Sequence, residues 1–254
     1  MTGGAGKQAE FEFDDRHTPL LSRSPAQIGL CGASFTADPS GALYWPDRRT
    51  LVVADLHLEK GSSFAQRGQF LPPYDTAATL EQLGAAIACH NAERVICLGD
   101  SFHDGEAAAR LSPGDAETIQ RLTARHDWIW ICGNHDPAPP EDWGGRVQEE
   151  LVLGALVFRH EAKPLVTVAG EVSGHFHPKA KVKLRAKQVT SRCFVSDGRR
   201  LILPAFGAYT GGLDVHDPAI ASLMRDPFRV LLAGRSKLYD FPSTRLRRAP
   251  IAVK

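Results

Sequence analysis

Three apolar runs in this chain each end in residues that can bind a metal ion, and this repeated arrangement constrains the fold more than any other feature. The runs are TLVVADLH (50–57), RVICLGD (94–100) and WIWICGNHD (128–136). Continuous apolar runs of this length are typical of strands buried on both faces. Loops that leave the carboxyl ends of strands in an α/β sheet form a shared crevice. The polar residues at these three ends are therefore expected to lie close together.

The segments between the runs have helical spacing. Asp75 or Thr76 is expected to cap a first helix, and a second helix is expected around 114–125. The first helix has four apolar residues spaced for one face: Leu80, Leu83, Ile87 and Ala88. Alternation of strands and helices predicts a largely parallel or mixed sheet flanked by helices.

The later part of the chain changes character. Shorter strands with little helix between them are expected in LVLGALVFRHE (151–161), PLVTVAGEVSGHFH (164–177), KVKLRAKQV (181–189) and RLILPAF (200–206). A second sheet packed against the first accommodates them, so residues 26–254 are expected to form one domain. Residues 1–25 are polar and aperiodic, which predicts a loosely ordered leader.

Seven side chains at or after these strands are candidate metal ligands: Asp55, His57, Asp100, Asn134, His160, His175 and His177. Residues i and i+2 of an extended segment point the same way, which explains the D-x-H and H-x-H spacings. Mixed carboxylate, amide and imidazole donors suit Mn, Fe or Zn, with Mn or Fe favoured over Mg and Mn expected first. Seven donors are too many for one ion that keeps an open position. They fit two divalent ions that share a carboxylate.

Each of these motifs alone has an ordinary structural explanation. The DLH sequence reads as a polar pair at a strand end, GD as a turn, and GNHD as a loop that happens to contain histidine. Five such pieces in order, four of them directly after apolar runs, make coincidence improbable.

The order D-x-H, G-D-x-x-[DH], G-N-H-[DE], H, G-H-x-H over residues 55–177 resembles the calcineurin-like binuclear metallophosphoesterases. The resemblance implies an α/β fold, a four-layer α/β/β/α sandwich of two mixed sheets flanked by helices. It also implies the ligand sets: Asp55, His57 and His177 for one ion, Asn134, His160 and His175 for the other, and Asp100 as the bridge. The expected activity is hydrolysis of phosphodiesters by a metal-activated water.

Longer stretches are similar to the DNA ligase-associated metallophosphoesterases: VVADLHLEKGSSFAQRGQFLPPYDT, GDSFHD, SGHFHPK and LPAFGAYTGG. This resemblance implies a DNA endonuclease of a repair pathway, acting on single-stranded or damaged DNA and associated in function with a DNA ligase, a helicase and an exonuclease. A small-molecule phosphoesterase acting on nucleotides or cyclic nucleotides has the same metal core and stays open as an alternative. A non-catalytic scaffold is the third interpretation, although such a protein is expected to have lost ligands.

His135 belongs to the GNH motif without being needed as a ligand, so we expect it to give a hydrogen bond or proton to the leaving oxygen. Many phosphatases of the superfamily have an aspartate three residues after the bridging one, paired with this histidine. Here that position is His103. Asp104 or Asp136 is therefore a candidate for orienting His135, and the spacing does not decide between them.

Positive charge is concentrated in the C-terminal part. Residues 1–158 have 12 Lys/Arg and 22 Asp/Glu, whereas residues 159–254 have 18 and 7. In PKAKVKLRAKQ the candidate DNA contacts Lys179, Lys181, Lys183 and Arg185 alternate with apolar residues, which on a strand places the cations on one face. An edge strand that uses lysines against aggregation is the competing interpretation. Arg67, in an expected loop over 61–74, is a further candidate for phosphate contact, or else a solvated surface residue. The glycine-rich FGAYTGG (206–212) either bends close to substrate or is a plain turn.

The chain has no apolar run long enough to cross a membrane, no secretory signal pattern, and five cysteines without a CxxC pair. These features predict a cytoplasmic protein with reduced thiols and no membrane partner.

Overall fold

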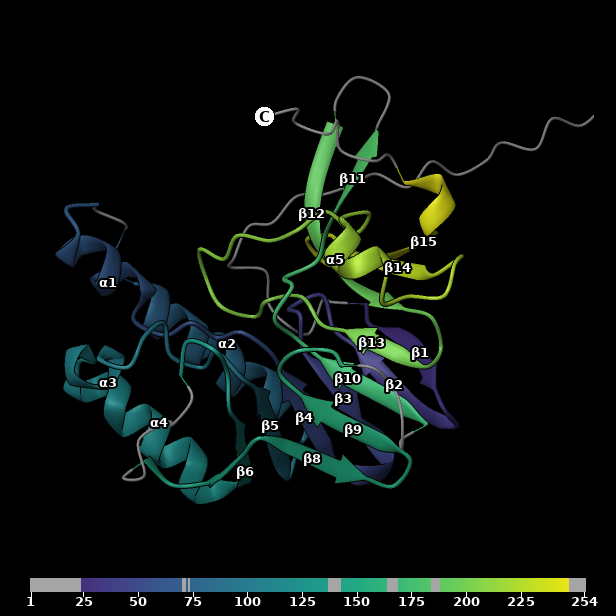
Figure 1. Ribbon diagram of the computed structural model, residues 1–254. Coiled ribbons are helices and arrows are strands. Elements are labelled where there is room, and N and C mark those ends of the chain that lie inside the picture. The colour runs from purple at the N-terminus through teal and green to yellow at the C-terminus, as the bar shows by residue number, and fades with distance from the viewer. Residues whose placement is uncertain are drawn as a thin grey trace, which may run out of the picture.

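Two mixed β-sheets face each other in the computed structural model, which describes residues 24–69, 72, 74–136, 143–163, 169–183 and 188–246 (Figure 1). The first sheet has the strand order β1-β2-β3-β4-β5-β6-β7. Its strands are β1 (Ala26–Leu30), β2 (Ala33–Ala37), β3 (Leu43–Trp45), β4 (Thr50–Val53), β5 (Arg94–Leu98), β6 (Asp127–Ile131) and β7 (Arg146–Gln148). The pairs from β1 to β4 are antiparallel and those from β4 to β7 are parallel.

The second sheet has the order β15-β14-β12-β13-β10-β9-β8. Its strands are β8 (Glu150–Leu153), β9 (Leu156–Arg159), β10 (Gly170–Ser173), β12 (Gln188–Ser196), β13 (Arg200–Ile202), β14 (Arg229–Ala233) and β15 (Leu238–Pro242). Strand β10 is parallel to β9 and β13, and the other pairs are antiparallel. Strand β11 (Lys179–Lys183) pairs with β12 alone, and the two form a hairpin that projects from the sheet (Figure 1).

Helices cover the outer face of each sheet (Figure 1). On the first sheet lie α2 (Asp75–His90) and α4 (Pro113–Arg125), with the shorter α1 (Lys60–Gln66) and α3 (Ala107–Arg110) beyond them. The second sheet carries α5 (Pro218–Ala221). Two 3-10 turns, η2 (Pro46–Arg48) and η4 (Ser243–Arg245), complete the described elements. The prediction of a four-layer α/β/β/α sandwich is confirmed.

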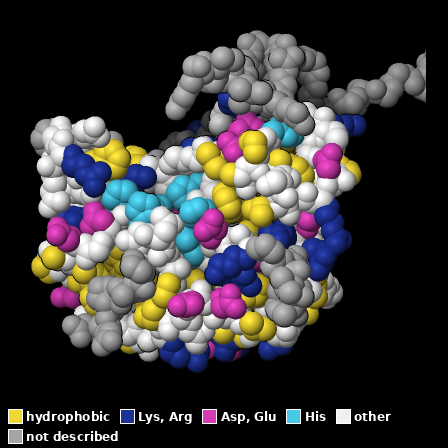
Figure 2. Space-filling view, in the orientation of Figure 1, with side chains coloured by type: hydrophobic (Ala, Val, Ile, Leu, Met, Phe, Trp, Pro, Cys, Tyr) yellow, Lys and Arg dark blue, Asp and Glu magenta, His cyan; other side chains and the backbone are white. Residues whose placement is uncertain are grey.

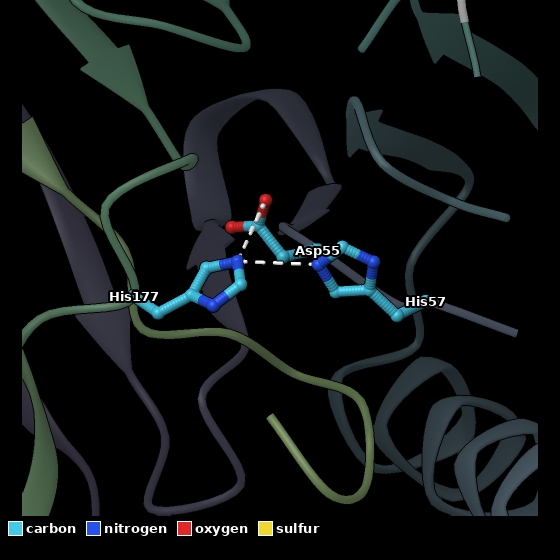
Figure 3. Close-up of side chains that lie close together, drawn as sticks. All are labelled: Asp55, His57 and His177. Atoms are coloured by element: carbon cyan, nitrogen blue, oxygen red, sulfur yellow. Dashed lines mark hydrogen bonds and ion pairs between the residues drawn. The ribbon is translucent and has the colours of Figure 1, made fainter. Parts of the chain in front are cut away.

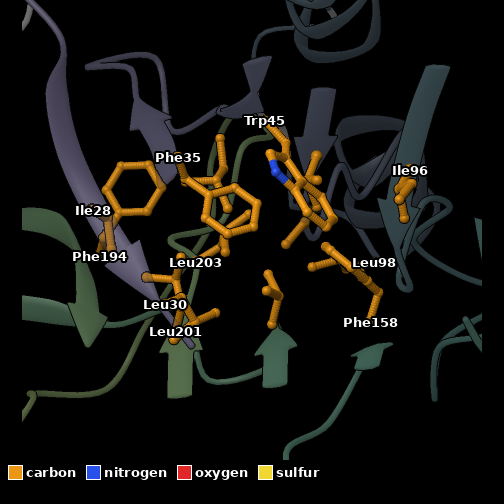
Figure 4. Packing of buried hydrophobic residues seen from close by; sticks show 14 of the residues in the cluster. Ile28, Leu30, Phe35, Trp45, Ile96, Leu98, Phe158, Phe194, Leu201 and Leu203 are labelled. Carbon is orange, nitrogen blue, oxygen red and sulfur yellow. The ribbon is translucent and has the colours of Figure 1, made fainter. Parts of the chain in front are cut away.

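The hydrophobic core lies in the three spaces between the four layers. Figure 4 shows the central cluster between the sheets, where Phe35, Trp45, Phe158 and Phe194 meet. Strand β4 shows why its last three residues are apolar: Val52 points into this cluster, whereas Leu51 and Val53 pack beneath α2 and α4. Both faces of the strand are buried there, which favours apolar side chains on each.

The predicted capping of α2 is wrong. The N-cap residue is Tyr74, and no side chain caps the helix there. The Asp75 carboxylate instead accepts a hydrogen bond from Gly61 N at 2.8 Å, and Thr76 Oγ1 accepts one from Glu59 N at 2.8 Å. These bonds fix the start of α1, in a segment where a loop was expected. Within α2, Ala88 is exposed, and Ala86 takes the buried position.

The boundaries of α4 follow from local chemistry. Ser112 accepts a hydrogen bond from Asp115 N at 3.1 Å and Pro113 occupies the first helical position, both common ways to begin a helix. Residues 1–23 of the expected leader lie outside the described residues, so the division into leader and single domain stays a prediction. Within the described part of the chain, no helix is both long and apolar enough to span a membrane.

Candidate metal centre

The seven candidate ligands converge where loops leave the two sheets. Asp55 and His57 follow β4, Asp100 follows β5, and Asn134 follows β6. From the second sheet, His160 follows β9, while His175 and His177 follow β10. Histidine side chains form a continuous row across the hollowed face of the molecule in Figure 2.

A first group contains Asp55, His57 and His177 (Figure 3). The Nε2 atoms of the two histidines lie 3.3 Å apart, and His177 Nε2 lies 3.3 Å from Asp55 Oδ1. Asp55 is fully buried and His57 is 3 % exposed. Three donor atoms thus point at one small volume from which most water is excluded.

A second group contains Asp100, His160 and His175, with Asn134 beside them. Asn134 Oδ1 lies 2.9 Å from His160 Nε2 and 3.0 Å from His175 Nδ1, and these two ring nitrogens are 3.1 Å apart. His160 Nδ1 faces the carbonyl oxygen of Leu98 at 2.9 Å. A hydrogen bond donated to that carbonyl leaves Nε2 as the free donor atom for a metal.

Asp100 lies between the two groups. Its Oδ2 is 3.9 Å from His57 Nε2 and 3.4 Å from His160 Nε2. Its Oδ1 accepts a hydrogen bond from the backbone N–H of His135 at 2.9 Å. One carboxylate oxygen is therefore held by the loop after β6, and the other faces both histidine clusters.

The backbone at these ligands adopts the left-handed conformation that non-glycine residues seldom occupy. The φ angles are 55° at Asp55, 44° at His57, 47° at Asp100, 71° at His175 and 45° at His177. Such conformations cost free energy and persist where the surrounding structure enforces them, most often at functional sites.

Close packing of the loops enforces this arrangement. A Cβ atom at Gly133 would lie 2.1 Å from Asp100 N, and one at Gly207 would lie 1.9 Å from Leu56 O. Gly207 belongs to the FGAYTGG loop, which therefore lies directly against the D-x-H motif. The only sign in the sequence that this loop approaches the D-x-H motif so closely was its high content of glycine.

Burial and mutual charge shift the ionisation of the ligands. Burial, reinforced by the neighbouring His177, lowers the pKa of His57 to about 2. Burial opposes protonation of His160 as well, but its hydrogen bond to Asp100 and the charges of Asp55 and Asp100 raise its pKa to about 9. Burial would raise the pKa of Asp100, yet the hydrogen bond and charge of His160 hold it below its usual value. The raised pKa of His160 reflects the carboxylates of Asp55 and Asp100 beside it, whose negative charge a bound cation would offset.

His135 lies at the mouth of this cluster, and its ring is exposed. The ring is stacked on that of His103 with centroids 5.5 Å apart, and it meets the ring of His57 edge-on at 5.3 Å. Its Nδ1 lies 3.0 Å from the backbone carbonyl oxygen of His103. A main-chain carbonyl, which a residue-type motif does not reveal, thus faces the nitrogen that an aspartate was expected to orient.

Neither Asp104 nor Asp136 orients His135. The Asp104 carboxylate accepts two hydrogen bonds from Arg110 Nη2, at 2.8 and 2.9 Å. The Asp136 carboxylate accepts hydrogen bonds from Ser101 N at 2.8 Å and Phe102 N at 3.0 Å, and burial raises its pKa to about 7. Asp136 therefore joins the loop after β6 to the loop that holds Asp100.

The candidate substrate contacts are placed in part. Ala180 is buried and Val182 half-buried against the core beneath α5, so Lys179 and Lys181 project from the other face of β11, as the alternation predicts. Lys179 Nζ donates a hydrogen bond to Thr210 O at 3.1 Å. Arg67 is exposed at the end of α1. Arg185 and the side chain of Lys183 lie outside the described residues.

The donor set fits two divalent ions. Within each histidine-containing group the ligand atoms all lie within 4.8 Å of one another. Imidazole, carboxylate and amide donors at this spacing are typical of Mn, Fe and Zn sites. The oxygen of Asp100 that faces both groups is suited to a bridge.

Comparison with known proteins agrees with this geometry. The model of the calcineurin-like phosphoesterase family matches residues 48–206. None of the curated proteins matches the sequence. The crystal structure of Pseudomonas putida nuclease MPE is similar with a TM-score of 0.68 and 29 % identity, covering 86 % of this chain and 100 % of that one. YfcE, a phosphoesterase from E. coli, is similar at a TM-score of 0.37 and 13 % identity over 72 % of this chain and 87 % of that one.

The family match spans every strand end that supplies a candidate ligand, and two adjoining groups of donors stand where those ends meet. The chain belongs to the calcineurin-like phosphoesterase family, as a metal-dependent hydrolase of phosphoesters with a binuclear site.

Proposed function

We propose that this protein is a DNA phosphodiesterase, an endonuclease that acts on single-stranded or damaged DNA during repair. The observation that carries the proposal is the likeness to the Pseudomonas putida nuclease, which extends over the whole of that chain. The same conclusion is supported by the resemblance to the DNA ligase-associated enzymes, which rests on the stretches VVADLHLEKGSSFAQRGQFLPPYDT, GDSFHD and SGHFHPK.

In the proposed site, one ion is held by Asp55, His57 and His177, the other by Asn134, His160 and His175, with Asp100 shared. When bound, two divalent ions lower the pKa of a water and offset charge that develops on the phosphate during an in-line displacement. The native metal is proposed to be manganese, since the donors mix nitrogen and oxygen. Elemental analysis of protein purified without added metal tests this, and iron or zinc in its place contradicts it.

His135 is proposed as the acid for the leaving oxygen. With Nδ1–H donated to the carbonyl of His103, Nε2 is the ring nitrogen that can carry a proton to the substrate. Its exposed position beside the buried ligands suits a group that meets substrate at the mouth of the site.

We propose that the β11 hairpin contacts DNA phosphates through Lys179, Lys181, Lys183 and Arg185. Arg67, at the end of α1, is proposed to contact a further phosphate. The excess of cations in residues 159–254 supports this. Reversal of charge by Lys181→Glu is expected to weaken DNA binding. It should also reduce the slope of log affinity against log salt concentration by about one unit or more. Lys237→Glu, on the exposed turn between β14 and β15, is the matched control.

The decisive assay compares substrates with purified protein and added manganese. Five substrates are tested separately: single-stranded DNA, duplex DNA, a bis(nitrophenyl) phosphodiester, the nitrophenyl monoester and a cyclic nucleotide. Faster hydrolysis of the cyclic nucleotide than of any DNA would support the small-molecule phosphoesterase instead. Lack of hydrolysis of all five would support the scaffold interpretation.

We further propose a cytoplasmic location and a functional association with a DNA ligase, a helicase and an exonuclease, on the strength of the sequence resemblance alone. Deletion of the coding sequence is expected to increase sensitivity to DNA damage. Deletion of the ligase is expected to increase it to the same extent. A deletion strain with ordinary damage tolerance would contradict the repair role.

A further inference from the structure

Helix α1 presents a basic and aromatic face beside the metal centre. Lys60, Phe64 and Arg67 follow one another at intervals of four and three residues, so they share one side of the helix. Figure 2 shows the row of histidines ending, over α1, at basic side chains with hydrophobic ones among them. We call these three residues the α1 wall.

The α1 wall is connected to His135 by a succession of ring contacts. Lys60 Nζ lies 5.9 Å from the centroid of the Phe64 ring, and that ring lies 5.9 Å from the ring of His103. The His103 ring is in turn stacked on His135. The α1 wall therefore adjoins the metal centre, because the His103 ring also meets the ring of His57 edge-on, with centroids 5.7 Å apart.

Within the described part of the chain, these side chains take part in neither a core cluster nor an ion pair with a carboxylate. Phe64 is half-buried but belongs to none of the hydrophobic clusters formed by the described residues. Among the described residues, neither Lys60 nor Arg67 forms an ion pair with a carboxylate; Asp75, the acid whose charge acts on Lys60, is bonded to Gly61 N. Lys60 and Phe64 are half-buried and Arg67 is exposed, so each of the three side chains keeps surface that a ligand could contact.

The helix is rigidly attached despite its short length. Asp75 and Thr76 bind the backbone at its first residues, and Arg110 Nε donates to Ser62 Oγ at 2.9 Å. Its side chains are therefore positioned before any ligand arrives, which lowers the entropy that binding must overcome.

We propose that the α1 wall binds an unpaired strand next to the scissile phosphate, with a base stacked on Phe64 and phosphates on either side held by Lys60 and Arg67. Alternation of cations and aromatic rings is how proteins hold single strands without reading sequence. From Lys60 to Arg67 the helix rises about 10 Å, at about 1.5 Å per residue. The proposal rests on the proposed DNA phosphodiesterase activity and adds the side chains that would hold the unpaired strand.

The test measures cleavage of a single-stranded oligonucleotide, its duplex, and the bis(nitrophenyl) diester by wild type and variants in manganese. Phe64→Ala is expected to raise KM for the single strand about tenfold, because the stacked base is lost, and Phe64→Trp to restore it. The ratio of kcat/KM for the single strand to kcat/KM for the nitrophenyl diester is expected to fall accordingly. Lys60→Ala and Arg67→Ala are each expected to reduce the slope of log affinity against log salt by about 0.7.

The chain supplies a matched control. Lys237 is exposed and also lies over an aromatic ring, with Nζ 5.0 Å from the Tyr239 centroid, on the turn between β14 and β15. Lys237→Ala is expected to cleave all three substrates with wild-type kcat and KM. Manganese content and melting temperature are measured for each variant beside activity, so that a variant that fails to fold is recognised. If Phe64→Ala fails to fold, Phe64→Leu replaces it.

The outcomes separate the two proposals. Equal losses on the oligonucleotide and the nitrophenyl diester, or on single strand and duplex, would overturn the α1 wall as a strand-binding surface. Wild-type protein that cleaves DNA no better than the Phe64→Ala variant would overturn it too, while the nuclease proposal stands. Wild-type protein that hydrolyses the nitrophenyl diester but no DNA would overturn both.

Discussion

The Nε2 atoms of His57 and His177 face each other at 3.3 Å, although 120 residues separate the two histidines along the chain. One comes from the loop after β4 in the first sheet and the other from the loop after β10 in the second. Asp55 Oδ1 completes the group at 3.3 Å from His177 Nε2 (Figure 3). Three atoms with lone pairs directed at one point are what a divalent cation requires, so the interface between the sheets forms a site that neither sheet supplies alone.

Asp100→Asn is expected to weaken both metal sites together, because the same Oδ2 atom faces His57 and His160. The amide lacks the negative charge that two cations need from a shared ligand. Manganese per chain should fall well below two, and the rise in melting temperature that manganese gives wild type should disappear. A variant that keeps two ions per chain would show that Asp100 is not shared.

His135→Ala is expected to reduce turnover by about 10²–10⁴-fold with metal content unchanged, because the ring stands outside both ligand groups. Metal analysis and steady-state kinetics on the nitrophenyl diester check this. His126→Ala is the control, since that ring faces the carbonyl of Leu122 in α4, away from both ligand groups. Loss of bound metal in His135→Ala would mean that this residue is a ligand instead.

His103→Ala is expected to cost less than tenfold in turnover, far less than the change at His135. The atom of His103 that faces His135 Nδ1 is its backbone oxygen, which alanine retains. What the substitution removes is the stacked ring. Equal losses in the two variants would show that the His103 imidazole itself takes part in proton transfer.

Gly207→Ala is expected to disrupt the site, because the added Cβ would stand 1.9 Å from Leu56 O, between Asp55 and His57. Backbone cannot move there without shifting both ligands. Reduced manganese affinity and a lower melting temperature are the expected readings. Gly211→Ala, in the same loop with open space around it, should behave as wild type. Identical behaviour of the two variants would contradict the packing argument.

Much of this protein follows from short stretches of sequence. The runs 50–57, 94–100 and 128–136 each contain a continuous apolar stretch, which predicted buried strands with polar residues at their carboxyl ends. The order of the motifs then indicated the family and the four-layer sandwich. The buried strands depend on patterns within a few residues, whereas the family and the sandwich were implied by the resemblance of motifs spread over residues 55–177.

Other features depended on contacts between distant segments. Helix α1 has no apolar periodicity in KGSSFAQ, and it forms because Asp75 and Arg110 bind its backbone and Ser62. The partner of His135 Nδ1 is a main-chain carbonyl, which no residue type reveals. The sequence by itself determined which atoms were available as donors and at which strand ends they would stand. Only the tertiary structure decided which of them face one another, because that depends on how two sheets pack and how closely Gly133 and Gly207 let the loops approach.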